Sequence, residues 1–211
     1  MKSVILPKMN QSGYYEMRLE SIGGLGANLC GKMLGELGIR YLGLNSASFS
    51  SYGSEKTGTP VKGYIRYCDA EKEIRVHSPI VEPHLLCIFH EALLQDKSVL
   101  QGCSKDTTVV LNTEKKPQEI VDNYFSDSQG CVQVAEICTI PAQRIAMEAH
   151  ARVNVVMLGA IVAACGFGNL DAVQQICQDT LGKKYPDSLE ANLNGIQRGY
   201  QEIQKLKLEK F

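Results

Sequence analysis

Residues 18–38 read RLESIGGLGANLCGKMLGELG, a strand pattern that passes through a glycine turn into an amphipathic helix. In the strand, Met17, Leu19 and Ser21 point to one face and the alternate residues point to the other. Gly23 and Gly24 permit a sharp reversal of the chain. The helix is predicted by apolar residues at helical spacing, which are Leu25, Leu29, Met33, Leu34 and Leu37.

The glycine turn is a candidate anion site. Backbone N–H groups at a helix start are unpaired and lie at the positive end of the helix dipole, so they favour a phosphate or another anion. We therefore expect ligand contacts from Gly23, Gly24, Leu25, Gly26 and Ala27. A turn that only lets the helix pack closely on the strand is the alternative, and the glycines alone do not separate the two hypotheses.

Two common nucleotide sites do not fit this turn. The dinucleotide fingerprint needs a glycine where Ser21 stands and an acidic residue where Asn45 stands. The phosphate loop of nucleoside triphosphatases needs Gly-Lys-Ser/Thr after the glycines, and none follows here. The sequence therefore argues against an NAD site and against a triphosphatase.

Length and charge set the broad class. A chain of 211 residues with 44% hydrophobic residues can bury roughly 70% of its unfolded surface, which suffices for one core. The formal net charge of −1 gives no electrostatic reason to expect nucleic acid or an anionic membrane as partner. The apolar run before Pro7 is too short for a signal peptide, and no later run spans a bilayer. We expect a cytoplasmic protein.

The eight cysteines do not form a metal-binding pattern. No two are separated by two residues, so the usual chelating unit of zinc and iron–sulfur sites is absent from the sequence. Most lie in apolar runs, where a free thiol behaves as a small hydrophobic group. We expect buried thiols and no metal. The cysteines are Cys30, Cys68, Cys87, Cys103, Cys131, Cys138, Cys165 and Cys177.

Strand and helix patterns alternate along the chain, which favours an α/β fold. We predict a three-layer α/β/α domain over residues 15–211 with a mixed, mostly parallel central sheet, preceded by an N-terminal extension, residues 1–14. The last third, from Pro141, is predicted to be helical and to end in a helix over 186–207. Further strands are predicted at 40–45, 61–68, 73–76, 85–89, 108–111 and 132–137, with a loop over 46–60 and a helix over 116–124.

Four segments in a fixed order resemble a known family. They are GGLGA (23–27), SYGSEKTGTPVKGYIR (51–66), SPIVEPHLL (78–86) and RVNVVMLGAIVAA (152–164). Together they look like the gamma subunit of 2-oxoacid:ferredoxin oxidoreductases, which is equivalent to the third domain of single-chain pyruvate:ferredoxin oxidoreductase. The chain departs from the family pattern at Ser21, Leu25, Ser54 and Thr57.

The resemblance implies a subunit that binds coenzyme A (CoA) and helps the enzyme assemble. In the family, alpha and beta subunits hold thiamine diphosphate, and delta and beta subunits hold 4Fe-4S clusters. The complex converts a 2-oxoacid, CoA and oxidised ferredoxin into acyl-CoA, CO2 and reduced ferredoxin. For this chain we expect CoA as a substrate, no tightly bound cofactor, no catalytic residue, and alpha, beta and delta subunits as partners.

The loop over 46–60 is the second candidate region, because long ordered loops are often functional. The family resemblance makes Tyr52, Gly53, Glu55, Lys56 and Gly58 candidates for an interface near the active site. Lys56 is a point charge suited to a CoA phosphate or a substrate carboxylate. A solvated surface loop is the alternative.

Asn154 stands among apolar residues at the start of a predicted helix, and we expect it to brace a loop. The histidines His77, His84, His90 and His150 are scattered, and we expect structural or surface roles for them.

Two other functions remain open from the sequence. One is the small subunit of indolepyruvate:ferredoxin oxidoreductase, which shares the glycine turn. The other is a free-standing regulator that binds CoA or a nucleotide. Copurification separates the regulator from the enzyme subunits, because only a subunit brings partners that carry thiamine diphosphate and iron–sulfur clusters.

Overall fold

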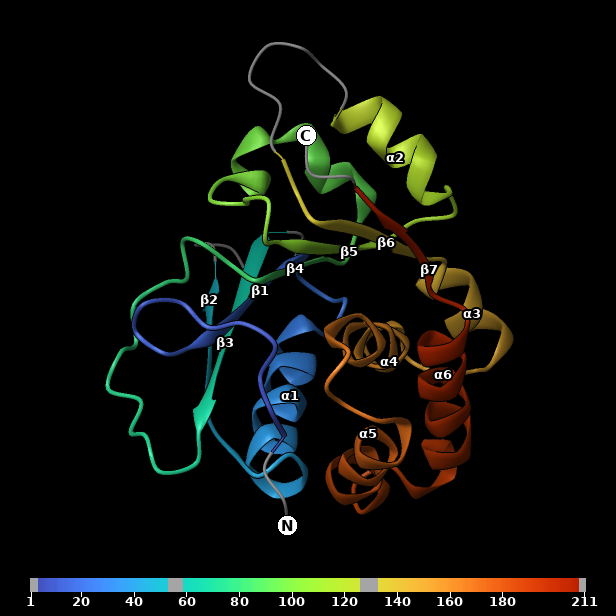
Figure 1. The fold of residues 1–211 in the computed structure, drawn as a ribbon. Helices are drawn as coiled ribbons and strands as arrows, with labels where there is room; N and C mark the ends of the chain where they lie inside the picture. The colour runs from blue at the N-terminus through green and yellow to red at the C-terminus, as the bar shows by residue number, and fades with distance from the viewer. Residues whose placement is uncertain (1–3, 53–58, 126–132, 209–211) are drawn as a thin grey trace.

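The computed structural model describes residues 4–52, 59–125 and 133–208. These residues form one sheet in the strand order β2-β3-β1-β4-β5-β6-β7 (Figure 1). The bounds are β1 Tyr15–Ile22, β2 Leu44–Tyr52, β3 Pro60–Asp69, β4 Leu85–Ile88, β5 Thr108–Asn112, β6 Glu136–Ile140 and β7 Gln204–Lys207.

The sheet contains both parallel and antiparallel strand pairs, as predicted. The central strands β1, β4, β5 and β6 run parallel to one another. The outer pairings are antiparallel: β3 pairs with β1 and with β2 on one side, and β7 pairs with β6 on the other. The parallel strands are covered on both faces, which explains their continuous apolar runs.

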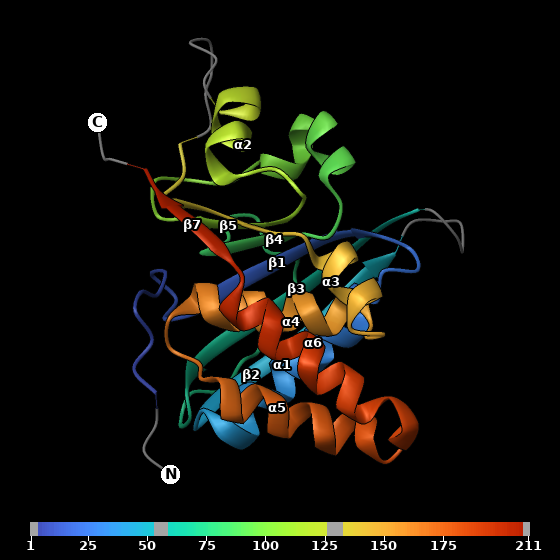
Figure 2. The ribbon, with the colours of Figure 1, turned by 90° about the vertical axis from the view of Figure 1, so that its right-hand side faces the viewer.

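Helices cover both faces of the sheet, so the predicted three-layer fold is confirmed (Figures 1 and 2). One layer holds α1 Ala27–Tyr41, α4 Val153–Cys165, α5 Leu170–Cys177 and α6 Leu189–Gln201. The other holds α2 Pro117–Tyr124 and the 3-10 helices η1 Glu91–Gln95 and η2 Lys97–Leu100. Short elements complete the chain: α3 Ala142–Glu148, the π-helix η3 Gln178–Gly182 and the 3-10 helix η4 Pro186–Ser188. None of the helices in the described ranges is long and apolar enough to cross a membrane.

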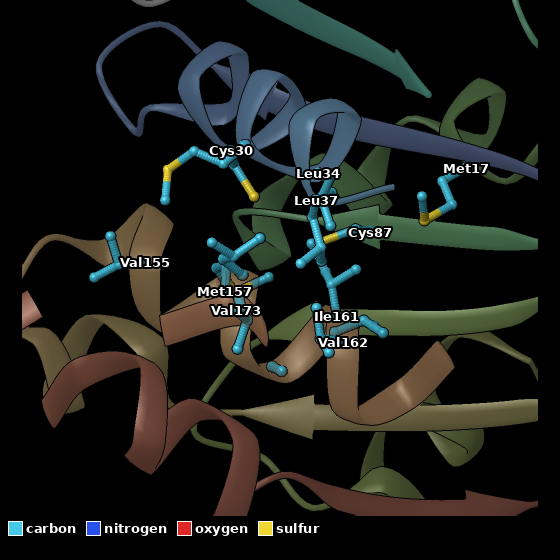
Figure 3. Close-up of a cluster of buried hydrophobic side chains, with 14 of the residues drawn as sticks. Met17, Cys30, Leu34, Leu37, Cys87, Val155, Met157, Ile161, Val162 and Val173 are labelled. Atoms are coloured by element: carbon cyan, nitrogen blue, oxygen red, sulfur yellow. The ribbon is translucent and has the colours of Figure 1, made fainter. Parts of the chain in front are cut away.

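The larger of two apolar cores lies between the sheet and the α1 layer. Met17 from β1 and Cys87 from β4 belong to this core together with Leu34 from α1, and α4 adds Val155 and Ile161 (Figure 3). Residues 154–162 of α4 are all buried, which confirms the burial predicted from a helix that is apolar on every side. The smaller core lies under α2 and is formed by Leu86, Ile88, Val109, Leu111, Ile120 and their neighbours.

The predicted strand over 40–45 is wrong for residues 40–43, and the predicted loop over 46–60 is wrong for residues 46–52. Helix α1 continues to Tyr41, and β2 then runs from Leu44 to Tyr52 in unbroken register with β3. The strand is rich in serine because α1 presses on it. A Cβ on Gly35 would lie 2.8 Å from Ser48 Oγ, so only small side chains fit at this contact.

The C-terminal prediction needs a second correction. Helix α6 ends at Gln201, and residues 204–207 form β7 instead of two more helical turns. Leu206 pairs with Ile137 at the otherwise open edge of β6. The preceding strand is β6 at Glu136–Ile140, displaced from the predicted 132–137. Residues 73–76 form no strand.

Candidate functional site

The glycine turn lies at the carboxyl edge of the parallel strands. The chain leaves β1 for α1 on one face of the sheet, whereas it leaves β4 for η1 on the other (Figure 1). Ligands of open α/β sheets bind where adjacent strands send their connections to opposite faces. In this sheet that position is between the carboxyl ends of β1 and β4, where residues 23–27 lie.

The turn combines two left-handed glycines with an open helix start. Gly24 and Gly26 have φ angles of 103° and 78°, in the left-handed region that favours glycine. Gly26 is the N-cap of α1, and the first turn of that helix has no acidic side chain. In the part of the chain that the structure describes, the N–H groups of Ala27, Asn28 and Leu29 have no acceptor. A Cβ on Gly24 would meet nothing within 4 Å, so that side of the turn is open.

Asn154 braces this turn from α4. Its side chain is 4% exposed, and its Nδ2 lies 3.4 Å from the carbonyl oxygen of Gly26. Burial of a polar side chain is costly unless it has such a partner. The structure thus brings together the first and the last of the segments that suggested the family.

The second candidate region lies beside the turn. The N–H of Gly23 donates to the carbonyl oxygen of Thr59 at 3.0 Å. Tyr52, at the end of β2, is 58% exposed and helps line a pocket of about 230 Å³ between α1 and β2. The lining residues are Asn28, Gly31, Lys32, Ser48, Phe49, Ser50 and Tyr52. Gly53, Glu55, Lys56 and Gly58 lie outside the described residues.

Buried charged side chains lie on the face of β1 that points away from α1. Strand alternation predicted this face for Arg18 and Glu20. The Nε of Arg18 lies 3.0 Å from Oε1 of Glu20, and the Nζ of Lys62 lies 3.2 Å from the same oxygen. Burial raises the pKa of Glu20, and the two cations oppose that rise. Arg18 also donates to the carbonyl oxygens of Ile80, Val81, Val99 and Gln101.

Two polar groups at the same edge were not predicted. Asn112 donates to the carbonyl oxygen of Phe89 at 3.0 Å and accepts from the N–H of Ala142 at 2.9 Å. It therefore links the ends of β4 and β5 to α3. The sequence signal that could have identified Asn112 is its place as a polar residue at the end of a buried strand.

Glu91 is the second of these polar groups. It accepts hydrogen bonds from Thr113, Lys115 and Tyr124. Burial alone would raise the pKa of Glu91, but the hydrogen bonds from Lys115 and Thr113 outweigh it and lower the pKa. These hydrogen bonds connect η1 to α2.

The described residues include seven cysteines and all four histidines. The seven cysteines in the described ranges are free thiols, and burial raises the pKa of Cys165 to about 12. Within those ranges no group of three His, Cys, Asp or Glu residues could hold a metal. Nδ1 of His84 accepts from the N–H of Glu16, and His90 caps η1. His77 and His150 are exposed, which agrees with the predicted surface positions.

Comparison with known proteins points to one family. Residues 16–202 match the pyruvate ferredoxin/flavodoxin oxidoreductase family. The chain is 30% identical over 193 residues to pyruvate synthase subunit PorC of Thermotoga maritima, covering 90% of this chain and 95% of that one. It is 29% identical over 175 residues to the pyruvate/ketoisovalerate oxidoreductase common subunit gamma of Pyrococcus abyssi, covering 80% and 90%.

Solved structures agree with these sequence relatives. The crystal structure of pyruvate oxidoreductase subunit PORC of Thermotoga maritima superposes with a TM-score of 0.76 at 25% identity, over 92% of this chain and 99% of that one. The 2-oxoglutarate:ferredoxin oxidoreductase of Magnetococcus marinus, solved with 2-oxoglutarate, coenzyme A and succinyl-CoA bound, superposes with a TM-score of 0.66 at 20% identity. That match covers 89% of this chain and 30% of the longer one, and it shows the fold alone.

Proposed function

Since the chain belongs to the pyruvate ferredoxin/flavodoxin oxidoreductase family, we propose that it is a gamma subunit whose glycine turn contacts CoA. The complex oxidatively decarboxylates pyruvate or a related 2-oxoacid to an acyl-CoA and reduces ferredoxin. Thiamine diphosphate, held by alpha and beta subunits, supplies the chemistry of decarboxylation. Iron–sulfur clusters in the beta and delta subunits would supply the path of electrons to ferredoxin.

The observation that carries this proposal is the open helix start at the carboxyl edge of the sheet. CoA has phosphate groups, and three unpaired N–H groups at the positive end of a helix are suited to one of them. Gly24 leaves room for the ligand, and Asn154 holds the turn in shape. The chain's own contribution is to bind and orient CoA, since residues 23–27 carry no acid–base or nucleophilic side chain.

The region around Tyr52 has a supporting role in the proposal. Its exposed ring at the end of β2 and the neighbouring residues Gly53, Glu55, Lys56 and Gly58 would line the interface with an alpha or beta subunit. The bond from Gly23 to Thr59 connects that region to the turn. Contacts in this region would therefore place a partner subunit next to the CoA site. We also propose a cytoplasmic location, where ferredoxin would be reduced.

Purification of the tagged chain from its own organism tests the proposal. We expect alpha, beta and delta subunits in the eluate, with thiamine diphosphate, iron and sulfide, and CoA-dependent reduction of ferredoxin by a 2-oxoacid. Recovery of the chain alone would instead indicate a regulator and would contradict the proposal. Turnover of indolepyruvate in place of pyruvate would assign the chain to the indolepyruvate enzyme.

A further inference from the structure

The two edges of the sheet differ in how well they are protected. At one edge, β7 is four residues long and carries Lys205 and Lys207. At the other edge, β2 is nine residues long, LNSASFSSY, and contains no charged residue and no proline. Its pairing with β3 runs from Leu44↔Asp69 to Tyr52↔Val61 without a bulge. Natural proteins usually shorten, charge or bend an edge strand to prevent pairing, and β2 uses none of these devices.

The outer edge of β2 presents backbone groups that can form hydrogen bonds. The N–H of Ser46 is bonded by Oδ1 of Asn45 at 2.8 Å, which indicates that this N–H points away from β3. In an antiparallel pair every second residue then points the same way, so the N–H groups of Ser48 and Ser50 also face outward. Across residues 4–52, 59–125 and 133–208, no strand other than β3 pairs with β2.

A pocket with one charge lies along this edge. Helix α1 contributes Asn28, Gly31 and Lys32 to the pocket of about 230 Å³, and β2 supplies the other lining residues. Lys32 is exposed and is the only charged residue among those lining residues. In the described part of the chain it has no ion-pair partner. The pocket therefore suits a side chain that carries a carboxylate.

We propose that β2 is a docking strand for an extended, acidic segment of a partner subunit. The segment pairs with the outer edge of β2 through its main chain, and one acidic side chain enters the pocket beside Lys32. Main-chain hydrogen bonds of this kind supply affinity, and a pocket for alternate side chains supplies specificity. The inference rests on the proposed function, because that function requires partner subunits.

Hydrogen–deuterium exchange of the full chain, alone and in the assembled complex, tests this inference. We expect the amides of Ser48 and Ser50 to exchange rapidly in the isolated chain and at least about 100-fold more slowly in the complex, because a paired amide must open before it exchanges. The outer amides of β7 are the internal control and should change little. A complex that forms with the correct mass while these β2 amides keep their fast exchange would overturn the inference alone.

Two further outcomes of the exchange experiment would overturn the inference in different ways. A chain that enters no complex would overturn both this inference and the proposed function. Protection of Ser48 and Ser50 that rises with the concentration of the isolated chain would show pairing with a second copy, and it would overturn the assignment to a partner subunit.

A matched pair of variants tests the pocket. Lys32→Glu should weaken assembly of the complex about tenfold, because it places like charges together at the interface. Lys207→Glu reverses a lysine at the opposite edge and should leave assembly unchanged. Equal assembly of the Lys32→Glu variant and the wild type, measured by native mass spectrometry across a dilution series, would overturn the acidic character of the partner segment.

Discussion

Asn154 occupies the space next to Gly26 that any larger residue at position 26 would need. The Cγ and Nδ2 atoms of Asn154 lie 2.9 Å from the position that a Cβ on Gly26 would take. Gly26 is the N-cap of α1 and Asn154 lies in the first turn of α4, so this contact joins two helix starts at the carboxyl edge of the sheet. The shape of the glycine turn thus depends on a residue far along the chain.

The first prediction follows from that contact. Gly26→Ala should lower the free energy of unfolding by about 2–4 kcal/mol, because a left-handed φ strains alanine and its Cβ meets Asn154. Gly24→Ala is the matched control. It has a positive φ as well but meets nothing within 4 Å, so its cost should be smaller by about 1 kcal/mol or more. Urea unfolding of the wild type and the two variants measures the difference. Equal losses of stability would show that the Asn154 side chain moves aside at little cost.

The second prediction concerns Arg18. Its guanidinium donates to four carbonyl oxygens of the segment 80–101 and pairs with the buried Glu20. Arg18→Met should destabilise the fold by about 3–5 kcal/mol, since it leaves a buried carboxylate and several carbonyl groups without this partner. The double variant Arg18→Met with Glu20→Met should recover part of the loss. A double variant no more stable than the single one would mean that the lost carbonyl contacts account for the whole effect.

The third prediction concerns pH. Burial lowers the pKa of His84, whose Nδ1 accepts a hydrogen bond from the N–H of Glu16 at 3.0 Å. The unfolded chain therefore binds a proton near pH 6.5 that the folded chain resists, and the stability from His84 is present above that pH and is lost as the pH falls below about 6.5.

His84→Asn is the test of that pH dependence. Asparagine offers an oxygen to the same N–H and does not titrate, so the variant should lose less stability than the wild type over this range. Thermal unfolding at several pH values gives the comparison. Parallel pH profiles for the two proteins would assign the acid sensitivity to other groups.

The fourth prediction tests how the C-terminal helix is held. A Cβ on Gly199 of α6 would lie 2.1 Å from the carbonyl oxygen of Val156 on α4. Backbone cannot move aside as a flexible side chain can, so Gly199→Ala should cost about 3 kcal/mol or more. Gln201→Ala, at an exposed position of the same helix, should change stability by less than about 0.5 kcal/mol. Similar melting temperatures for both variants would argue against close packing of α6 on α4.

Much of the fold could be predicted because its helices and strands have one apolar face. The alternation in β1 and the helical spacing in α1 follow from packing against a single core. β2 could not be predicted in this way, because its residues are small and polar for a tertiary reason, the close approach of Gly35 to Ser48. β7 was missed because Leu206 fits helical spacing equally well, and only the open edge of β6 makes it a strand.

The candidate site shows the same limit. The glycine turn and Asn154 could each be found as a local pattern, but their contact joins residues 128 positions apart, and no local rule predicts it. Asn112 and Glu91 were missed for a related reason. Their partners lie on neighbouring parallel strands and helices, which only the folded sheet brings together.

The CoA dependence of the assembled complex tests the central claim most directly. Asparagine and aspartate have nearly the same shape, both tolerate a positive φ better than most residues, and only aspartate carries a negative charge. A Cβ at position 24 has open space within this chain, so Gly24→Asn and Gly24→Asp should assemble equally well.

The account predicts a KM for CoA at least about tenfold higher for Gly24→Asp than for Gly24→Asn, because the added carboxylate would repel the phosphate and compete for the same N–H groups, and each charge-assisted hydrogen bond lost costs about 1.5–3 kcal/mol. The KM for the 2-oxoacid should be the same in both. Fully assembled Asn and Asp variants that share the wild-type KM for CoA would contradict the account and would leave the glycine turn as a packing device.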